Sequence, residues 1–244
     1  MKTSKLLFAV AVTAAVVSVE TAIAQKSAEF EVASIKPSPP GPNNSESRFD
    51  PGGTFTATGT PLKALLQVAY GVNGFEIAGG PKWLESDRYD VIAKPAASEN
   101  LSEEQMKPMI QQLLVDRFRL KIHRKTRELP VYSMVVGKNG PKLTANTGAP
   151  GPGWGMGPGQ LDAHKISMAM LASALESQLD RNIIDKTGIR GDYDVKLDWG
   201  RDDSVEAGPA IFTALQEQLG LRLESTKGPV SVIVIDRAER PSAN

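Results

Sequence analysis

The sequence contains no cysteine, only two histidines, and no surplus of charge of either sign. The absence of cysteine excludes disulfides, thiolate metal sites and cysteine nucleophiles. The 28 basic and 28 acidic residues cancel, so the overall charge favours neither nucleic acid nor an anionic membrane as a partner. Without disulfides the protein must be stabilised by its hydrophobic core, and 244 residues are enough to form one.

Recognisable catalytic and metal-binding patterns are also missing. The sequence has no H-E-x-x-H, no G-x-S-x-G, no P-loop and no ligand set with metal spacing. His123 lies among lysines and arginines, which disfavour both its protonated form and a bound metal cation. His164 precedes a helix expected to start near Ser167, where a capping or surface role is expected. The sequence therefore predicts no catalytic residue, no metal ligand and no cofactor.

Residues 1–24 have the pattern of a secretory signal peptide. Two lysines precede an apolar stretch from Leu6 to Val19, and Ala22 and Ala24 supply small residues before Gln25. The apolar stretch is short for a membrane span. We therefore predict cleavage after Ala24 and a periplasmic or secreted protein that has no membrane span once the signal is removed.

One short segment of the chain is written twice. Tyr89-Asp90-Val91 recurs as Tyr193-Asp194-Val195, and amphipathic helices and short strands follow in the same order around each copy. The sequence predicts an α+β fold of two tandem β-α-β-β-α-β-β repeats, each with two helices packed on a small mixed sheet. Because side chains alternate along a strand, the tyrosines and valines should face one way and the aspartates the other.

The predicted boundaries follow from turn residues and composition. Residues 25–144 form the first repeat, in which Phe30–Pro37 is a leading strand, and residues 160–244 form the second. Residues 145–159, rich in glycine and proline, are interpreted as a linker. Thr60-Pro61 is expected to start a helix, with the threonine as N-cap. Turns are predicted in each half at the proline-containing segments, which are 127–130 and 228–229.

Four residues are candidates for contact with a ligand or partner. Arg119, Lys121 and His123 belong to a basic run, Arg117 to Arg127, that could face an anionic partner. The alternation of this run with Leu120 and Ile122 is equally typical of the water-facing side of a strand. Trp154 is unusual in a linker, where it either docks the loop or contacts a partner. Nucleic acid is not expected as the target of an exported protein.

Several segments resemble a large family of exported proteins of unknown function from soil bacteria. These segments are Phe30–Pro37, Gly79–Leu84, Arg117–Lys121, Glu128–Tyr132, Asp185–Gly188, Leu219–Leu221 and Glu239–Asn244. The resemblance implies no catalytic residue, although relatives joined to membrane metallopeptidase sensors imply a sensing role outside the cytoplasm. Each half is also similar in its order of elements to the short N-terminal domain of secretins and TonB-dependent receptors, a periplasmic docking module.

These observations favour an extracytoplasmic, non-catalytic binding or docking module whose partner is an unknown envelope protein or small ligand. Strand addition at an exposed sheet edge is the recognition mode that such a fold most readily offers. The alternative is an envelope hydrolase with an unrecognised active site, which would require a deep pocket with clustered carboxylates or a histidine. The groove between the repeats is the first place where such a pocket is expected.

Overall fold

The computed structural model describes residues 30–241, apart from residues 40, 42–43, 96–100, 147, 149–150 and 200–206. The predicted signal peptide lies outside the described residues. The fold is a mixed α+β fold, as predicted, and its strands form three four-stranded sheets. No described helix is both long enough and apolar enough to cross a membrane.

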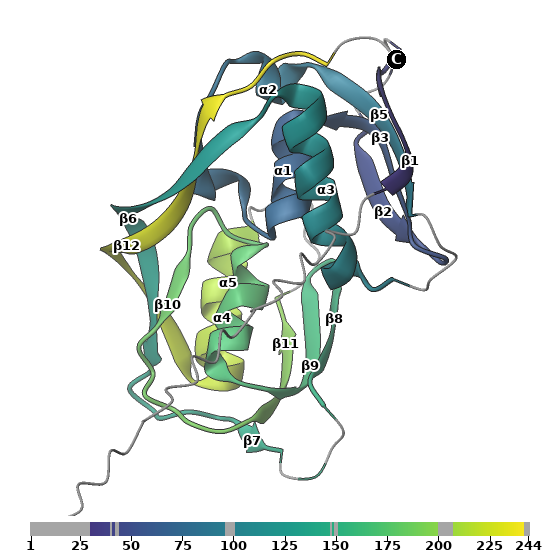
Figure 1. The fold of residues 1–244 in the computed structure, drawn as a ribbon. Helices are drawn as coiled ribbons and strands as arrows, with labels where there is room; N and C mark the ends of the chain where they lie inside the picture. The colour runs from purple at the N-terminus through teal and green to yellow at the C-terminus, as the bar shows by residue number, and fades with distance from the viewer. Residues whose placement is uncertain are drawn as a thin grey trace, which may run out of the picture.

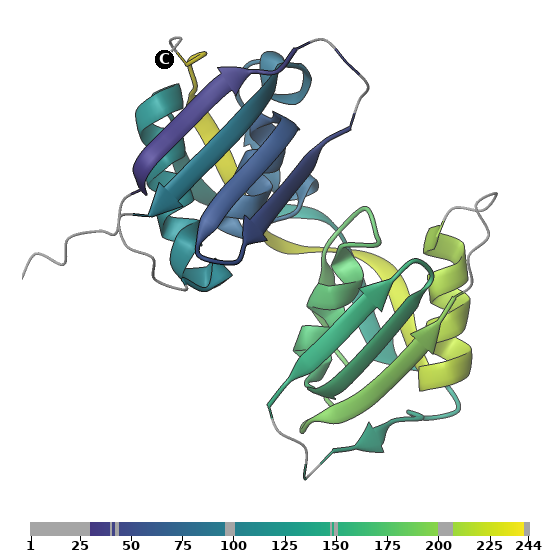
Figure 2. The same ribbon diagram turned by 90° about the vertical axis from the view of Figure 1, so that its right-hand side faces the viewer.

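Sheets A and C are antiparallel, and each carries one lobe of the molecule (Figure 2). Sheet A has the order β1 (Phe30–Pro37), β5 (Arg88–Pro95), β3 (Thr54–Pro61) and β2 (Glu46–Asp50). Sheet C has the order β7 (Thr144–Ala145), β11 (Tyr193–Asp198), β9 (Gln160–Ile166) and β8 (Gly153–Gly157). We call the part around sheet A lobe 1 and the part around sheet C lobe 2.

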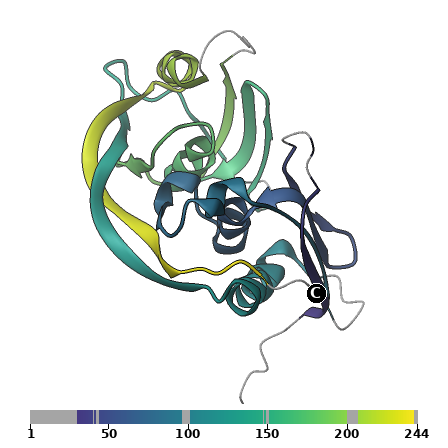
Figure 3. The ribbon, with the colours of Figure 1, turned by 90° about the horizontal axis from the view of Figure 1, so that it is seen from above.

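Sheet B is mixed and is shared by both lobes (Figure 1). It has the order β10 (Ile183–Asp185), β6 (Lys121–Val136), β12 (Leu221–Arg237) and β4 (Ile77–Gly79). Strands β6 and β12, which are separated in sequence by all of lobe 2, pair as one long antiparallel ribbon that curves along the side of the molecule (Figure 3). The short strand β4 pairs in parallel with β12, and β10 pairs in parallel with β6. Each half of the chain therefore adds an edge strand to the long strand of the other half.

The helices lie between the sheets (Figures 1 and 2). Those of lobe 1 are α1 (Leu62–Tyr70), the 3₁₀ turn η1 (Gly74–Glu76), α2 (Trp83–Ser86) and α3 (Glu103–Phe118). Those of lobe 2 are α4 (Met168–Glu176), α5 (Ala207–Ala214) and the π-helical turn η2 (Leu215–Leu219). The core of lobe 1 joins Phe55 of β3, Leu65 of α1 and Ile235 of β12. An equivalent core in lobe 2 joins β9, α4 and β6, so each helix layer is buried on two sides.

In each lobe, the aspartate of the repeated Tyr-Asp-Val triplet accepts a hydrogen bond from an irregular point of the neighbouring strand. Tyr89 and Val91 are buried in the lobe 1 core, whereas the Asp90 carboxylate accepts the backbone N–H of Gly59 at 2.9 Å. In lobe 2, the Asp194 carboxylate accepts the backbone N–H of Lys165 at 3.1 Å. Gly59 and Lys165 both have a left-handed backbone, with φ of 59° and 52°, beside a register shift between the paired strands. The predicted alternation of side chains is confirmed, and each aspartate stabilises a bulge of the neighbouring strand by accepting a backbone hydrogen bond.

The structure corrects three details of the sequence interpretation. Residues 127–130 and 228–229 form no turns, because β6 and β12 continue straight through them and pair with each other. Helices do not pack on a separate mixed sheet in each half, because the mixed sheet is common to both. Residues 153–157 of the predicted linker form strand β8.

The start of α1 also differs from the prediction. Pro61 occupies the N-cap position without a side-chain hydrogen bond, and Thr60 belongs to β3. The buried Thr60 hydroxyl donates instead to backbone carbonyls, at 3.0 Å to Glu46 and 3.1 Å to Thr58. In α3, by contrast, the expected capping box between Ser102 and Gln105 is present.

Candidate functional site

The amino-terminal half of β6 is an edge strand. From Lys121 to Val131 it pairs with β12, and β10 joins its other side only at Tyr132–Met134. Among the residues that the structure describes, no strand covers the remaining side of Lys121–Val131. Six consecutive residues of this segment, His123–Glu128, are exposed. The unpaired N–H and C=O groups of such an edge are a template for a further strand.

Two prolines lie in the same section of the β6–β12 ribbon. Pro130 lies opposite Lys227, and Pro229 lies opposite Glu128. A proline has no N–H to donate, so within sheets it is confined to strands with a free side. Because the β6–β12 ribbon is only two strands wide here, both prolines are accommodated without interrupting the pairing. The residues that suggested turns in the sequence therefore identify an open edge.

Basic side chains line one face of this edge strand. Ile122 packs against the lobe 1 core, so the residues that alternate with it face away from the helices. These outward residues of β6 are Lys121, His123, Lys125 and Arg127. Three valines of β12 lie directly opposite the last three, namely Val234, Val232 and Val230. The neighbouring strand thus offers aliphatic side chains to the middle of the basic row, and no carboxylate there.

The charges of this row are largely unpaired within the protein. His123 Nδ1 lies 2.9 Å from a carboxylate oxygen of Asp236. Within the described ranges, Lys121, Lys125 and Arg127 form no ion pair. We call the free edge and outward face of Lys121–Arg127 the basic edge. It combines unpaired backbone groups with unneutralised side-chain charge.

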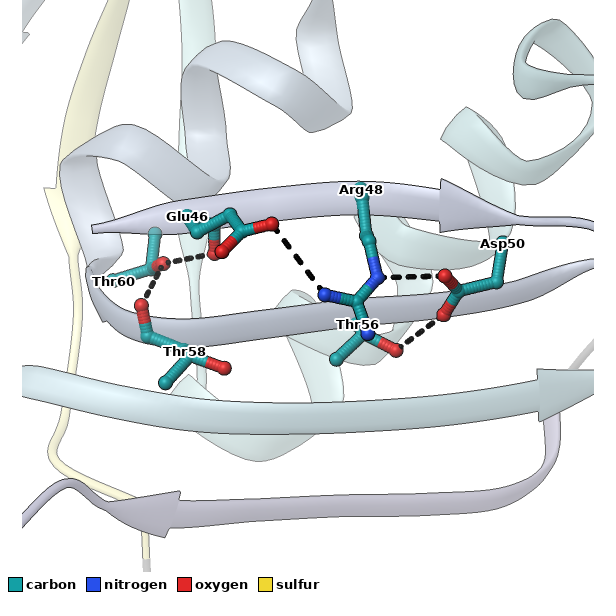
Figure 4. Close-up of polar contacts among 6 residues, drawn as sticks. All are labelled: Glu46, Arg48, Asp50, Thr56, Thr58 and Thr60. Atoms are coloured by element: carbon teal, nitrogen blue, oxygen red, sulfur yellow. Dashed lines mark hydrogen bonds and ion pairs between the residues drawn. The ribbon is translucent and has the colours of Figure 1, made fainter. Parts of the chain in front are cut away.

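The outer face of sheet A shows the opposite arrangement (Figure 4). Arg48 of β2 lies between two carboxylates, with Nε 2.7 Å from Asp50 and Nη1 3.4 Å from Glu46. The Thr56 hydroxyl donates to the second Asp50 oxygen at 2.8 Å. Hydrogen bonds from Arg48 and then Thr56 lower the pKa of Asp50, so this carboxylate is held in its charged form. The charges of this face therefore satisfy one another, whereas those of the basic edge do not.

The structure separates the four candidate contact residues into two places. Lys121 and His123 lie on the basic edge, and Arg119 lies just before it as the exposed C-cap of α3, with a left-handed φ of 48°. Trp154 lies in lobe 2 on β8, where 56% of its surface is exposed. It is therefore not part of the basic edge. Lys125 and Arg127, which belong to the same basic run of the sequence, lie on the same face of β6 as Lys121 and His123.

The described cavities lie within single lobes. A cavity of about 340 Å³ lies against sheet C, lined by backbone of Gly155 and Gly157 and by Asp162, Lys196 and Asp198. Another of about 440 Å³ lies beside β4 and α2, where Lys63 pairs with Glu85 at 2.7 Å. The lobes themselves are linked by a hydrogen bond of 3.0 Å from Asn182 Nδ2 to Glu76 Oε1.

The second histidine forms part of a small polar group on sheet C. His164 Nε2 lies 3.6 Å from Asp162, and its Nδ1 lies 3.7 Å from Asp194. The main partners of the Asp194 carboxylate are Asn146 and the Lys165 N–H, and these lower its pKa. Within the described residues there is no group of three histidine or acidic side chains that could hold a metal ion.

Comparison with known proteins places the chain in a family without giving it an activity. No curated protein matches the chain, and no solved structure matches it. One family model matches residues 63–238, a range that includes the whole of lobe 2 and all of β6 and β12, whereas β1, β2 and β3 of sheet A lie before it. The chain belongs to this family, DUF3738, which is described as a protein of unknown function.

Proposed function

We propose that the protein is an extracytoplasmic, non-catalytic docking module that binds an extended segment of a partner by strand addition. The observation that carries this proposal is the free edge of β6 between Lys121 and Val131. An added strand would use main-chain hydrogen bonds for affinity and alternate side chains for specificity. The location outside the cytoplasm is supported by the signal-peptide pattern of residues 1–24.

The way in which the β6–β12 ribbon is anchored supports strand addition over a role as a simple spacer between the lobes. The segment is anchored at both ends, because Ile122 packs in the lobe 1 core and Met134 in the lobe 2 core. Val131, Val230 and Val232 are buried in a third cluster between them. The exposed backbone of His123–Glu128 is therefore held in an extended conformation before a partner arrives. A preformed strand lowers the ordering cost of binding.

We also infer that the two halves of the chain arose by duplication of one unit. Sheets A and C place their strands in corresponding order, and in each lobe an aspartate of the Tyr-Asp-Val triplet binds a left-handed residue of the neighbouring strand. The exchange of β4 and β10 between the halves fits such a pair. In this view the duplication creates the long β6–β12 ribbon, and with it a free strand edge that a single unit would lack.

Amide hydrogen exchange of the chain from Gln25 onward tests the docking mode. The probes are blocked nine-residue peptides in which threonine alternates with glutamate, serine or lysine. Strand addition should slow exchange at every second amide of Lys121–Val131, because only alternate N–H groups point to the free edge. The edge strand β2 serves as an internal control and should not change. The proposal is wrong if no peptide of the panel slows exchange at these amides.

A further inference from the structure

We propose that the basic edge selects an extended peptide segment with acidic side chains at alternate positions. This inference rests on the proposed function, since it names the chemistry of the segment that adds to β6. Two observations carry it: the strand has a free side, and its outward face holds Lys121, His123, Lys125 and Arg127. Neither observation depends on the other.

The spacing of the charges determines the pattern that fits them. Residues two apart in a strand are separated by about 6.6 Å, and a strand added beside β6 has the same repeat. Side chains directly opposite each other across two strands share a face and lie within contact distance. Carboxylates at alternate positions of the added strand would therefore meet the cations of the basic edge, which are Lys121, Lys125 and Arg127. A segment with consecutive acidic residues would place half of them on the wrong face.

The two faces of β6 differ in charge, and the difference favours acidic side chains on the outward face. The outward face has Asp236 beside His123 as its neighbouring carboxylate, and valines lie opposite Lys125 and Arg127. The face toward the helices carries Arg124 and, four residues later, Glu128, so its charges are mixed. Arg124 alternates in phase with Ile122, which packs against the lobe 1 core, so it belongs to the helix-facing side. A matched charge change at Arg124 thus tests the opposite face of the same strand.

Binding of the glutamate–threonine peptide, followed by calorimetry on the chain from Gln25 onward, tests the inference. Lys125→Glu and Arg127→Glu should each weaken binding at least ten-fold, which corresponds to ~1.4 kcal/mol. The control Arg124→Glu introduces the same charge change on the other face and should weaken binding less than three-fold. If Lys125→Glu does not fold, Lys125→Gln should still weaken binding about three-fold. Raising the salt concentration should weaken binding of the acidic peptide, because exposed charges are screened.

Other outcomes would overturn the inference in distinguishable ways. If the serine–threonine peptide binds as tightly and protects the same amides, strand addition stands but acidic selection is wrong. Equal losses in Arg124→Glu and Lys125→Glu would mean that only overall charge matters. If heparin binds tightly and no peptide does, the surface binds polyanions and both proposals fail. If none of the probes binds, the lysines only guard the edge against aggregation, and both proposals fail again.

Discussion

Gly220 ends the π-helical turn η2 and provides the sharpest test of the packing in lobe 2. It is buried, with a left-handed φ of 65°, and an added Cβ would lie 2.1 Å from the carbonyl oxygen of Gly140. That carbonyl belongs to the turn after β6, which is fixed by hydrogen bonds of 2.8 Å from Gly137 N–H to Gly220 and from Lys142 N–H to Leu219. The neighbouring atom is backbone and cannot move alone.

Gly220→Ala should therefore combine two costs. The left-handed conformation costs a residue with a Cβ ~1–2 kcal/mol, and forced overpacking adds ~1–3 kcal/mol. The sum, roughly 2–5 kcal/mol, is a large part of the 5–15 kcal/mol that is typical of a folded protein. Urea unfolding followed by circular dichroism measures it. A destabilisation of this size would also lower Tm by several degrees.

Two other glycines separate these costs. Gly188 has a left-handed φ of 68° but open space around an added Cβ, so Gly188→Ala should show the conformational cost alone. Gly153 has open space and no left-handed φ, so Gly153→Ala should change stability by less than about 0.5 kcal/mol. If Gly220→Ala were as mild as Gly188→Ala, the turn at 137–142 would not pack against Gly220, and the reasoning would be refuted.

Two further stability predictions concern lobe 2. Lys165→Gly should change the free energy of unfolding by less than about 1 kcal/mol, because removal of a left-handed Cβ offsets the greater conformational entropy of glycine in the unfolded chain and the N–H that binds Asp194 is kept. A destabilisation above about 2 kcal/mol in urea unfolding would contradict this. Burial and the nearby Glu76 carboxylate raise the pKa of Glu176, against the hydrogen bond from Ile183 N–H, so the stability associated with its protonated form is lost as pH rises above the ordinary pKa of a glutamate. Glu176→Gln keeps an acceptor for Ile183 and should flatten the dependence of Tm on pH over that range; an identical pH profile would contradict the assignment.

The sequence was most informative where local patterns determine structure. The capping box at Ser102 and the apolar spacing after it predict α3, because both are contained within a few turns of the helix. The Tyr-Asp-Val strands were likewise predictable, since Val91 and Val195 alternate with polar residues in a sheet with one buried face. These elements need no knowledge of their partners.

The long pairing of β6 with β12 is not predicted by the sequence, because the two strands are distant in the chain. Proline at 130 and Gly228-Pro229 are typical of turns, and a turn is the local interpretation. Gly228 instead lies where an added Cβ would come within 2.6 Å of the Ile184 side chain and 3.2 Å of the Val131 side chain, so a larger residue would force these side chains to shift. That close approach depends on β10 joining β6, which no local pattern specifies. The same holds for β8, whose glycines carry no strand signal until β9 pairs with it.

The candidate site was predicted in part. The charge and alternation of the basic run predict Lys121 and His123 as contacts, and the structure places Lys125 and Arg127 of the same run on the same face. Trp154 was grouped with them only because it is an unusual residue in its segment, and it lies on a different lobe. The free edge itself follows from strand order, which depends on the pairing of β4 and β10.

Intermolecular nuclear Overhauser contacts test the central claim most directly, that β6 receives an additional strand. They would be measured between the labelled chain and the unlabelled glutamate–threonine peptide. The account predicts regular main-chain contacts between the peptide and alternate residues of Lys121–Val131, with none to β2 or β8. Contacts confined to side-chain tips of the basic edge, or located on another strand, would contradict it.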